Sequence, residues 1–243
     1  MEQMEIQRRV CGEIEKMKEE IVQALQDLVR IPSVVGYEEK GQTFMEERYR
    51  SLGLKVVRLM PDLRKVKEHP AFIDTGMSYE NRPNVIGILT GDSARPSLIL
   101  NGHIDVVSPE PIEAWTRDPW AAEIEGDKMY GRGTADMKAG LLANFFALKG
   151  ISNAGLKPKG TVMLQSVIDE EAGGGGGTLA CLAEGYTANG MIVSEPHNLN
   201  VTIAHAGINY FRVKVLGKTS HAGLAHLGVN AIGKMYLIYQ ALI

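Results

Sequence analysis

Hydrophobic side chains recur every three or four residues near the start of the chain, a spacing that marks one face of an α-helix. The pattern predicts an amphipathic helix over residues 12–30, which ends before Pro32 because proline cannot continue a helix. A second helix is predicted over residues 38–52 and stops at Gly53. The apolar positions that define the first helix are Ile14, Met17, Ile21, Leu25 and Leu28.

Short apolar runs bounded by turn-forming residues follow, and they predict β-strands. A helical run at 137–150 separates two of these strands, whereas residues 61–83 and 109–120 show no clear period and are interpreted as loops. Strands that alternate with helices predict an α/β fold with a mixed, mostly parallel sheet and helices on both faces. The predicted strands cover residues 54–60, 84–91, 97–103, 160–171 and 190–196.

Composition narrows the classes of function. The chain has 243 residues, of which 44% are hydrophobic and 23% charged, as in ordinary globular proteins with a sizeable core. Its net charge of −3 and its lack of a basic face argue against nucleic acid as a partner. No apolar stretch approaches the roughly 20 residues of a membrane span. Cys11 and Cys181 form no redox or metal spacing and no secretory signal is recognised, so we expect a cytoplasmic protein without membrane contact.

Two titratable residues, His103 and Asp105, interrupt the apolar run "LILNGHIDVV" over residues 98–107. Burying such groups beside a core strand costs free energy unless something compensates. A single histidine after a strand is more often a hydrogen-bonded structural residue than a ligand. The meaning of this run therefore depends on which other polar residues reach the same place.

Four acidic residues occupy comparable positions, after a strand or at the start of a helix. Each has an ordinary explanation on its own, but in an open α/β sheet such positions meet at the carboxyl ends of the strands. Carboxylates packed there repel one another unless a divalent cation supplies positive charge. We therefore interpret His103 as a metal ligand, and Asp105 as the residue whose carboxylate accepts the other ring N–H of His103 and fixes its tautomer. The four acidic residues are Asp136, Glu170, Glu171 and Glu195.

Five sequence motifs occur in a fixed order between about residue 84 and residue 240. They are "NGHIDVV", "WTRDPWAAEIEGDKMYGRGTADMKAG", "VIDEEAGG", "IVSEP" and "VLGKTSHAGLAHLGVNAI". The key residues of the first three motifs are separated by 33 (136 − 103) and 34 (170 − 136) positions. The motifs resemble those of the acetylornithine deacetylase / succinyl-diaminopimelate desuccinylase family, the co-catalytic zinc amidohydrolases that also include aminoacylases and carboxypeptidase G2-like enzymes.

The resemblance implies two Zn²⁺ ions per active site, with Co²⁺ or Mn²⁺ as possible substitutes. It implies that His103, Glu171 and Glu195 are metal ligands and that Asp136 bridges the two metals. Glu170 is then not a ligand but the general base, which works with a metal-bridged hydroxide and later delivers a proton to the leaving amine.

The implied reaction is hydrolysis of the amide bond of a small N-acyl amino acid, such as N-acetylornithine, by a metal-dependent deacylase. Two alternatives stay open: a desuccinylase or peptidase-type member of the same family, and a catalytically inactive metal-binding protein of the same fold. Glu170 favours an enzyme, because a protein that only binds metal needs ligands but no base. The glycine run at 173–177 is interpreted as a flexible turn that lets the backbone approach the metal site.

The resemblance also implies two domains. Residues 1–203 correspond to a zinc aminopeptidase-like catalytic domain, and residues 204–243 to the beginning of an inserted α+β lid domain that forms a homodimer. His221 would reach the partner's active site and hydrogen-bond the developing oxyanion, whereas His205 and His226 match no such role. The family has one further histidine ligand downstream. We therefore expect both domains to be incomplete in this chain, and the 243 residues alone to hold at most one Zn²⁺ tightly, without deacylase activity.

Overall fold

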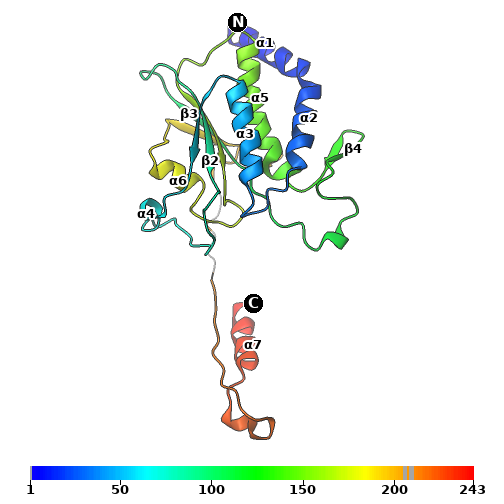
Figure 1. Ribbon diagram of the computed structural model, residues 1–243, viewed down its shortest axis with the longest axis vertical. Helices are drawn as coiled ribbons and strands as arrows, with labels where there is room; N and C mark the ends of the chain where they lie inside the picture. The colour runs from blue at the N-terminus through cyan, green and yellow to red at the C-terminus, as the bar shows by residue number, and fades with distance from the viewer. Residues whose placement is uncertain (1, 205–206, 208–210) are drawn as a thin grey trace. The chain divides into compact units, whose positions relative to one another are not determined.

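The structure, a computed structural model, describes residues 2–204, 207 and 211–243. It divides into two compact units, Met1–Leu199 and Asn200–Ile243. The first unit holds a five-stranded sheet with helices packed against it, and every candidate metal ligand belongs to this unit (Figure 1). None of the described helices is long and apolar enough to cross a membrane.

The sheet has five strands, in the spatial order β1 (Lys55–Leu59), β2 (Asn84–Leu89), β6 (Val162–Val167), β3 (Leu98–His103) and β7 (Gly190–Val193). Strands β6, β3 and β7 run parallel, whereas β2 is antiparallel to both of its neighbours, β1 and β6. The mixed sheet confirms the predicted fold class. Because the parallel strands are the ones that precede candidate site residues, their carboxyl ends bring those residues to one edge of the sheet.

On one face of the sheet, α3 (Glu39–Ser51) and α5 (Ala139–Asn153) pack against the strands, and α1 (Glu2–Lys16) and α2 (Lys18–Val29) pack on α5 (Figure 1). Their apolar sides join one buried cluster, in which Tyr49 and Phe145 are fully buried aromatic residues. The opposite face packs against α6 (Thr178–Ala183), whose buried Cys181 shares a second cluster with Ile99 of β3. Helices on both faces therefore bury β3 and β6 and fix the edge that carries the site.

The N-terminal helix differs from its prediction, because it begins at Glu2 and is interrupted at Met17. The Met17 side chain is buried, and its sulfur accepts a hydrogen bond from Asn153 of α5 at 3.4 Å. Gly150 of α5 lies so close to Ile14 that a Cβ there would meet that side chain at 2.8 Å. The interruption lets α1 and α2 both pack on α5. Such contacts join distant residues, so the local period does not report them.

Short elements occur where the sequence shows no period. The predicted loop at 61–83 contains one helical turn, α4 (Leu63–Val66). A hairpin of β4 (Glu123–Glu125) and β5 (Lys128–Tyr130) is absent from the prediction, because strands of three residues are too short to establish an alternating pattern.

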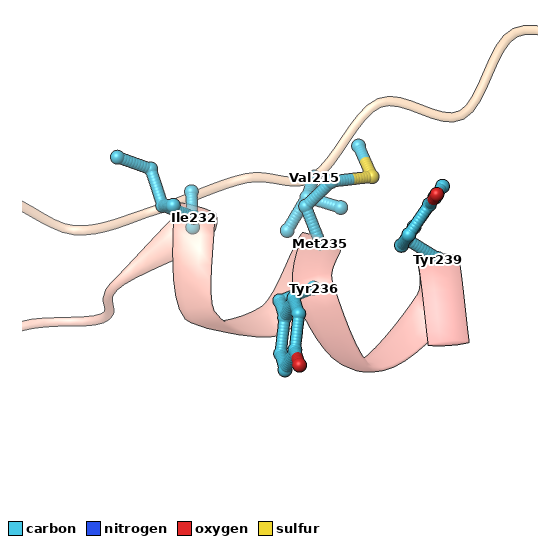
Figure 2. Close-up of a pocket in the computed structure, with 6 residues that line it drawn as sticks. Val215, Ile232, Met235, Tyr236 and Tyr239 are labelled. Atoms are coloured by element: carbon cyan, nitrogen blue, oxygen red, sulfur yellow. The ribbon is translucent and has the colours of Figure 1, made fainter. Parts of the chain in front are cut away.

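The second unit consists of an extended segment, the short helical turn η3 (Ala222–Leu227) and helix α7 (Ala231–Leu242). No residue that the structure describes in this unit is buried. An open apolar groove of about 510 Å³ is lined by α7 and the extended segment, and Figure 2 shows Val215 next to Met235 there. The described part of this unit therefore has no apolar core of its own.

Candidate metal centre

The candidate site is built from four segments that are distant in the sequence. Strand β3 ends at His103, and its register places its end beside the end of β6, which Glu170 follows. Glu195 follows β7. Asp136 comes from the turn η2 (Thr134–Lys138), in which its backbone is not helical, directly before α5. The carboxyl ends of three parallel strands and the start of one helix thus meet, as the sequence predicts.

The Nε2 atom of His103 faces three carboxylates. It lies 3.1 Å from Oδ1 of Asp136, 3.6 Å from Oε2 of Glu170 and 3.6 Å from Oε1 of Glu195. His103, Asp136 and Glu195 each offer one ligand atom, and these three atoms all lie within 4.8 Å of one another. The structure therefore brings together four of the residues singled out in the sequence.

The other ring nitrogen of His103 is fixed by a backbone group. Nδ1 lies 2.8 Å from the carbonyl oxygen of Asp105 but 3.7 Å from Oδ1 of the same residue. A carbonyl oxygen only accepts hydrogen bonds, so Nδ1 carries the hydrogen and the lone pair of Nε2 remains available to a cation. The tautomer is the expected one, but the acceptor is the backbone of Asp105 rather than its carboxylate.

The carboxylate of Asp105 has a different contact. Its Oδ2 accepts the backbone N–H of Glu171 at 3.0 Å, because the turn after β6 brings that N–H to it. Burial raises the pKa of the Asp105 carboxyl to about 7. Asp105 thus contacts the His103 ring through its carbonyl, while its carboxylate holds the segment that carries Glu171. A hydrogen bond from the ring to the carboxylate stays a prediction.

The charges of the site are poorly balanced without a cation. Burial, reinforced by the charges of Asp136 and Glu170, raises the pKa of Glu171 and of Glu195 above the ordinary glutamate range. Burial acts to lower the pKa of His103, but the surrounding carboxylates outweigh it and raise the pKa. A bound divalent cation relieves this competition for positive charge.

The donor set fits such a cation. A neutral imidazole and several carboxylates provide the nitrogen and oxygen ligands that Zn²⁺, Co²⁺ and Mn²⁺ accept. Among the residues that the structure describes, Glu171 is not part of the group whose ligand atoms converge. Its role as a ligand, the bridging role of Asp136 and the presence of two metals stay predictions.

Contacts between β7 and α5 position the segment that carries Glu195. The Ser194 hydroxyl donates to Oδ1 of Asn144 at 2.6 Å, and the amide of Asn144 donates to the carbonyl of Asn101 in β3 at 3.3 Å. Gly140 is required in the first turn of α5, because a Cβ there would lie 2.1 Å from the carbonyl oxygen of Ser194. Helix α5 therefore fixes the approach of Glu195 to the site.

Lys138 is a residue near the site that the sequence analysis does not single out. Its side chain is fully buried, and Nζ donates to the carbonyls of Leu28 at 3.1 Å and Ile31 at 2.8 Å. The Leu28 carbonyl belongs to the last turn of α2, where the helix carries partial negative charge, and Ile31 follows directly after the helix. Lys138 thus ties the turn that carries Asp136 to α2. The one feature of the sequence that could have pointed to Lys138 is its position directly before the apolar run at 139–148.

His221 belongs to the second unit, where it is exposed at the start of η3 and its Nδ1 accepts the backbone N–H of Gly223 at 3.1 Å. Its role at a partner's active site stays a prediction. His226 is exposed in the same unit, and His205 lies outside the described residues.

Comparison with known sequences identifies related proteins. Residues 99–235, more than half of the chain, match peptidase family M20/M25/M40. The chain is 30% identical to an N-formyl-4-amino-5-aminomethyl-2-methylpyrimidine deformylase of Halalkalibacterium halodurans, over 100% of this chain and 56% of the relative. It is 29% identical to a probable succinyl-diaminopimelate desuccinylase of Staphylococcus aureus, over 92% of this chain and 50% of the relative. The chain spans about half the length of the curated relatives it matches.

Comparison with solved structures shows the same fold in two peptidases. Human carnosine dipeptidase 1 superimposes with a TM-score of 0.61 at 21% identity, over 77% of this chain and 41% of that one. A tripeptidase from Staphylococcus aureus gives a TM-score of 0.56 at 22% identity, over 88% of this chain and 53% of that one. At these identities the similarity concerns the fold alone.

Proposed function

Because the chain belongs to peptidase family M20/M25/M40, we propose that the whole protein is a metal-dependent amidohydrolase that cleaves the amide bond of a small N-acyl compound. The observation that carries this proposal is the convergence of three carboxylates on Nε2 of His103. All four side chains lie within the matched residues 99–235. The family membership confirms the resemblance of the motifs.

The cation would be held by His103, Asp136 and Glu195, with Glu171 as a further carboxylate ligand and Asp136 as the bridge if two cations bind. Zn²⁺ is the proposed metal, and Co²⁺ or Mn²⁺ would suit the same donors. A cation bound by these residues lowers the pKa of a water molecule and polarises a carbonyl group.

Glu170 is the proposed general base. Its side chain is 54% exposed, while its Oε2 lies 3.6 Å from Nε2 of His103, so the carboxylate borders both the site and the solvent. In this position Glu170 can take a proton from an attacking water molecule and deliver it to the leaving amine. Asp105 supports both sides of the site, through its carbonyl on the His103 ring and its carboxylate on the backbone of Glu171.

The proposed substrate is an N-acyl amino acid such as N-acetylornithine. The relative from Staphylococcus aureus is named a probable desuccinylase, which supports an acylated diamino acid as substrate. The relative from Halalkalibacterium halodurans is named a deformylase of an aminopyrimidine and matches the whole chain. An N-formyl aminopyrimidine is therefore the second candidate substrate.

Hydrolysis of a panel of substrates by the whole protein tests this function. The protein is stripped with a chelator, reloaded with Zn²⁺, Co²⁺ or Mn²⁺, and assayed on N-formyl, N-acetyl and N-succinyl amino acids, an N-formyl aminopyrimidine and dipeptides. We expect metal-dependent release of amine from at least one acyl class. Tight metal binding without any hydrolysis would support the catalytically inactive alternative, and failure to bind metal would contradict the site itself.

We further propose that the whole protein is a homodimer in which His221 of the partner subunit donates a hydrogen bond to the developing oxyanion. Complementation tests this arrangement. His221→Ala and Glu170→Gln homodimers should each be nearly inactive, whereas heterodimers of the two variants contain one intact site and should regain activity. If mixing after subunit exchange restores no activity, His221 does not act across a dimer.

A further inference from the structure

The turn between β6 and Glu170 is built around Asp169, a buried carboxylate that the metal centre does not use. Asp169 is fully buried, and its φ angle of +70° lies in the left-handed region that residues other than glycine rarely adopt. Its carbonyl accepts the N–H of Gly174 at 2.9 Å. A residue in such a conformation persists only where its surroundings fix it. The next two residues are Glu170 and Glu171, so any freedom at Asp169 would be passed directly to both.

Arg82 brings positive charge to this turn from the segment that precedes β2. Its guanidinium donates to Oδ1 of Asp169 at 3.2 Å and, with two nitrogens, to both carboxylate oxygens of Glu38 at 2.9 and 2.7 Å. The three side chains are at most 3% exposed. Buried charges are costly unless they are paired, and a planar guanidinium can serve two carboxylates at once. Arg82 therefore holds Asp169 against Glu38, at the start of α3.

Tyr79 and the glycine run hold the second carboxylate oxygen of Asp169. The Tyr79 hydroxyl donates to Oδ2 at 2.6 Å, and the N–H of Gly176 donates to the same atom at 3.3 Å. A Cβ on Gly174 would lie 1.8 Å from Oδ2 of Asp169, and one on Gly176 would lie 2.0 Å from the Tyr79 ring. The run at 173–177 is thus a closely packed cover over Asp169 rather than the flexible turn expected from its sequence.

The far end of the turn is tied to the metal centre. The N–H of Glu171 donates to the carboxylate of Asp105 at 3.0 Å, and the carbonyl of Asp105 lies 2.8 Å from Nδ1 of His103. The backbone of the pair Glu170–Glu171 is therefore fixed at two points. Asp169 holds the chain directly before Glu170, and the Asp105 carboxylate holds the N–H of Glu171.

From these contacts we infer that Arg82 and Tyr79 are positioning residues of the site. By fixing Asp169, they aim the Glu170 carboxylate at the attacking water and keep Glu171 at the metal centre. The first half of this inference rests on the proposed function of Glu170 as the base. The second half rests on the proposed role of Glu171 as a metal ligand but not on hydrolysis, because a ligand's placement acts on metal binding whether or not the protein cleaves an amide.

Two substitutions weaken the contacts on Asp169 to different degrees. Tyr79→Phe removes one hydrogen bond and leaves the ring, and Arg82→Lys keeps the charge but cannot reach two carboxylates with a planar fork. The matched control is Arg58→Lys, because Arg58 also bridges two carboxylates, Glu39 and Glu46, on α3. This control disrupts an ion-pair network of the same composition on α3, more exposed than that of Arg82, and Arg58 forms no ion pair with Asp169 in the described part of the chain.

Co²⁺ binding to the 243-residue chain reports the position of Glu171 without any assay of activity. We expect Tyr79→Phe and Arg82→Lys to weaken Co²⁺ affinity by about 10-fold and to shift the visible absorption of the bound ion, as loss of a supporting contact does at metal sites. Arg58→Lys should leave affinity and spectrum as in the wild type. Wild-type Co²⁺ affinity and spectrum in folded Tyr79→Phe would overturn the inference, even if Arg82→Lys fails to fold.

Steady-state kinetics of the whole protein reports the aim of Glu170. Both variants should lower kcat by about 10- to 100-fold, the scale of a misplaced catalytic group, with KM within about twofold of wild type. An unchanged kcat in a folded variant would overturn the positioning of the base. If the wild type hydrolyses nothing in the panel, the proposed function fails, and the Co²⁺ comparison still decides whether Arg82 and Tyr79 position Glu171.

Discussion

Arg82 and Lys138 are two buried cations that support the same metal centre by different means. Arg82 lies behind the Glu170 turn and faces two buried carboxylates, Glu38 and Asp169. Lys138 lies behind Asp136 and donates to carbonyls at the end of α2, with its Nζ 5.8 Å from the Trp120 ring centre. Within the described part of the chain, Lys138 forms no ion pair, and burial is the one cause that shifts its pKa.

The difference appears in how burial acts on each charge. Burial lowers the pKa of Lys138 to about 7, because carbonyl dipoles replace hydration only in part. Burial also acts to lower the pKa of Arg82, but the bonds to Glu38 and Asp169 outweigh it and raise the pKa. Arg82 is therefore one member of a balanced charge network. Lys138 is a single charge next to the end of α2. Removing the charge of Arg82 and removing that of Lys138 should therefore lower the free energy of unfolding by unequal amounts.

The largest effect on stability is expected from Arg82→Met. It removes the guanidinium and leaves the carboxylates of Glu38 and Asp169 buried and unpaired, which costs about 3–5 kcal/mol. Urea denaturation of the 243-residue chain measures the loss in the free energy of unfolding. A loss below about 1 kcal/mol would show that the network does not carry this part of the fold.

The glycine cover over Asp169 should be the next most sensitive feature. A Cβ on Gly176 would lie 2.0 Å from the Tyr79 ring, so Gly176→Ala must displace that ring and should cost about 1–3 kcal/mol. Gly12 in α1 has nothing within 4 Å of its added Cβ, so Gly12→Ala is the control and should be neutral or slightly stabilising. Equal behaviour of the two variants in thermal denaturation would contradict the close packing of the run.

Asp105→Ala is expected to weaken Zn²⁺ binding by about 10- to 100-fold, through loss of the bond to the backbone of Glu171. The tautomer of His103 should persist, because its acceptor is the Asp105 carbonyl, which alanine retains. Zinc titration with a competing chelator and ¹⁵N spectra of the His103 ring test the two statements separately. A change of tautomer in the variant would return the carboxylate to the role first expected of it.

Lys138→Met is expected to have the smallest effect on stability, within about 1 kcal/mol of wild type, because a buried charge without a carboxylate partner can be replaced by an apolar chain of similar length. The lost bonds to the Leu28 and Ile31 carbonyls offset part of the gain from removing the charge. Denaturation alongside Arg82→Met gives the comparison. A loss as large as that of Arg82→Met would show that the two cations play equivalent roles.

The convergence of His103, Asp136 and Glu195 could be predicted because strand ends and helix starts can be located from local patterns. The rule that ligands gather at the carboxyl ends of parallel strands then places these residues together. The sequence does not specify which oxygen of Asp105 accepts the His103 hydrogen, because the carbonyl and the carboxylate belong to the same residue. That choice depends on how the chain turns after β3.

The network around Arg82 could not be predicted for a different reason. Arg82 lies 44 residues from Glu38 and 87 residues from Asp169, and ion pairs at such separations leave no local period. The segment that carries Tyr79 and Arg82 lacks periodicity and is therefore interpreted as a loop, although both side chains are buried. When residues are buried by contacts with distant parts of the chain, their sequence shows no helical or strand period, so the segment is indistinguishable from an exposed loop.

The most direct test separates metal binding from catalysis at Glu170, the residue directly before the proposed ligand Glu171. It measures bound Zn²⁺ and kcat in the same preparation of whole protein carrying Glu170→Gln. We expect Zn²⁺ content near that of the wild type, because His103, Asp136 and Glu195 are unchanged, together with a fall in kcat of about 10²- to 10⁴-fold, the usual contribution of a general base. Loss of Zn²⁺ from this variant would contradict the assignment and show that Glu170 is a ligand, and an unchanged kcat would show that it is not the base.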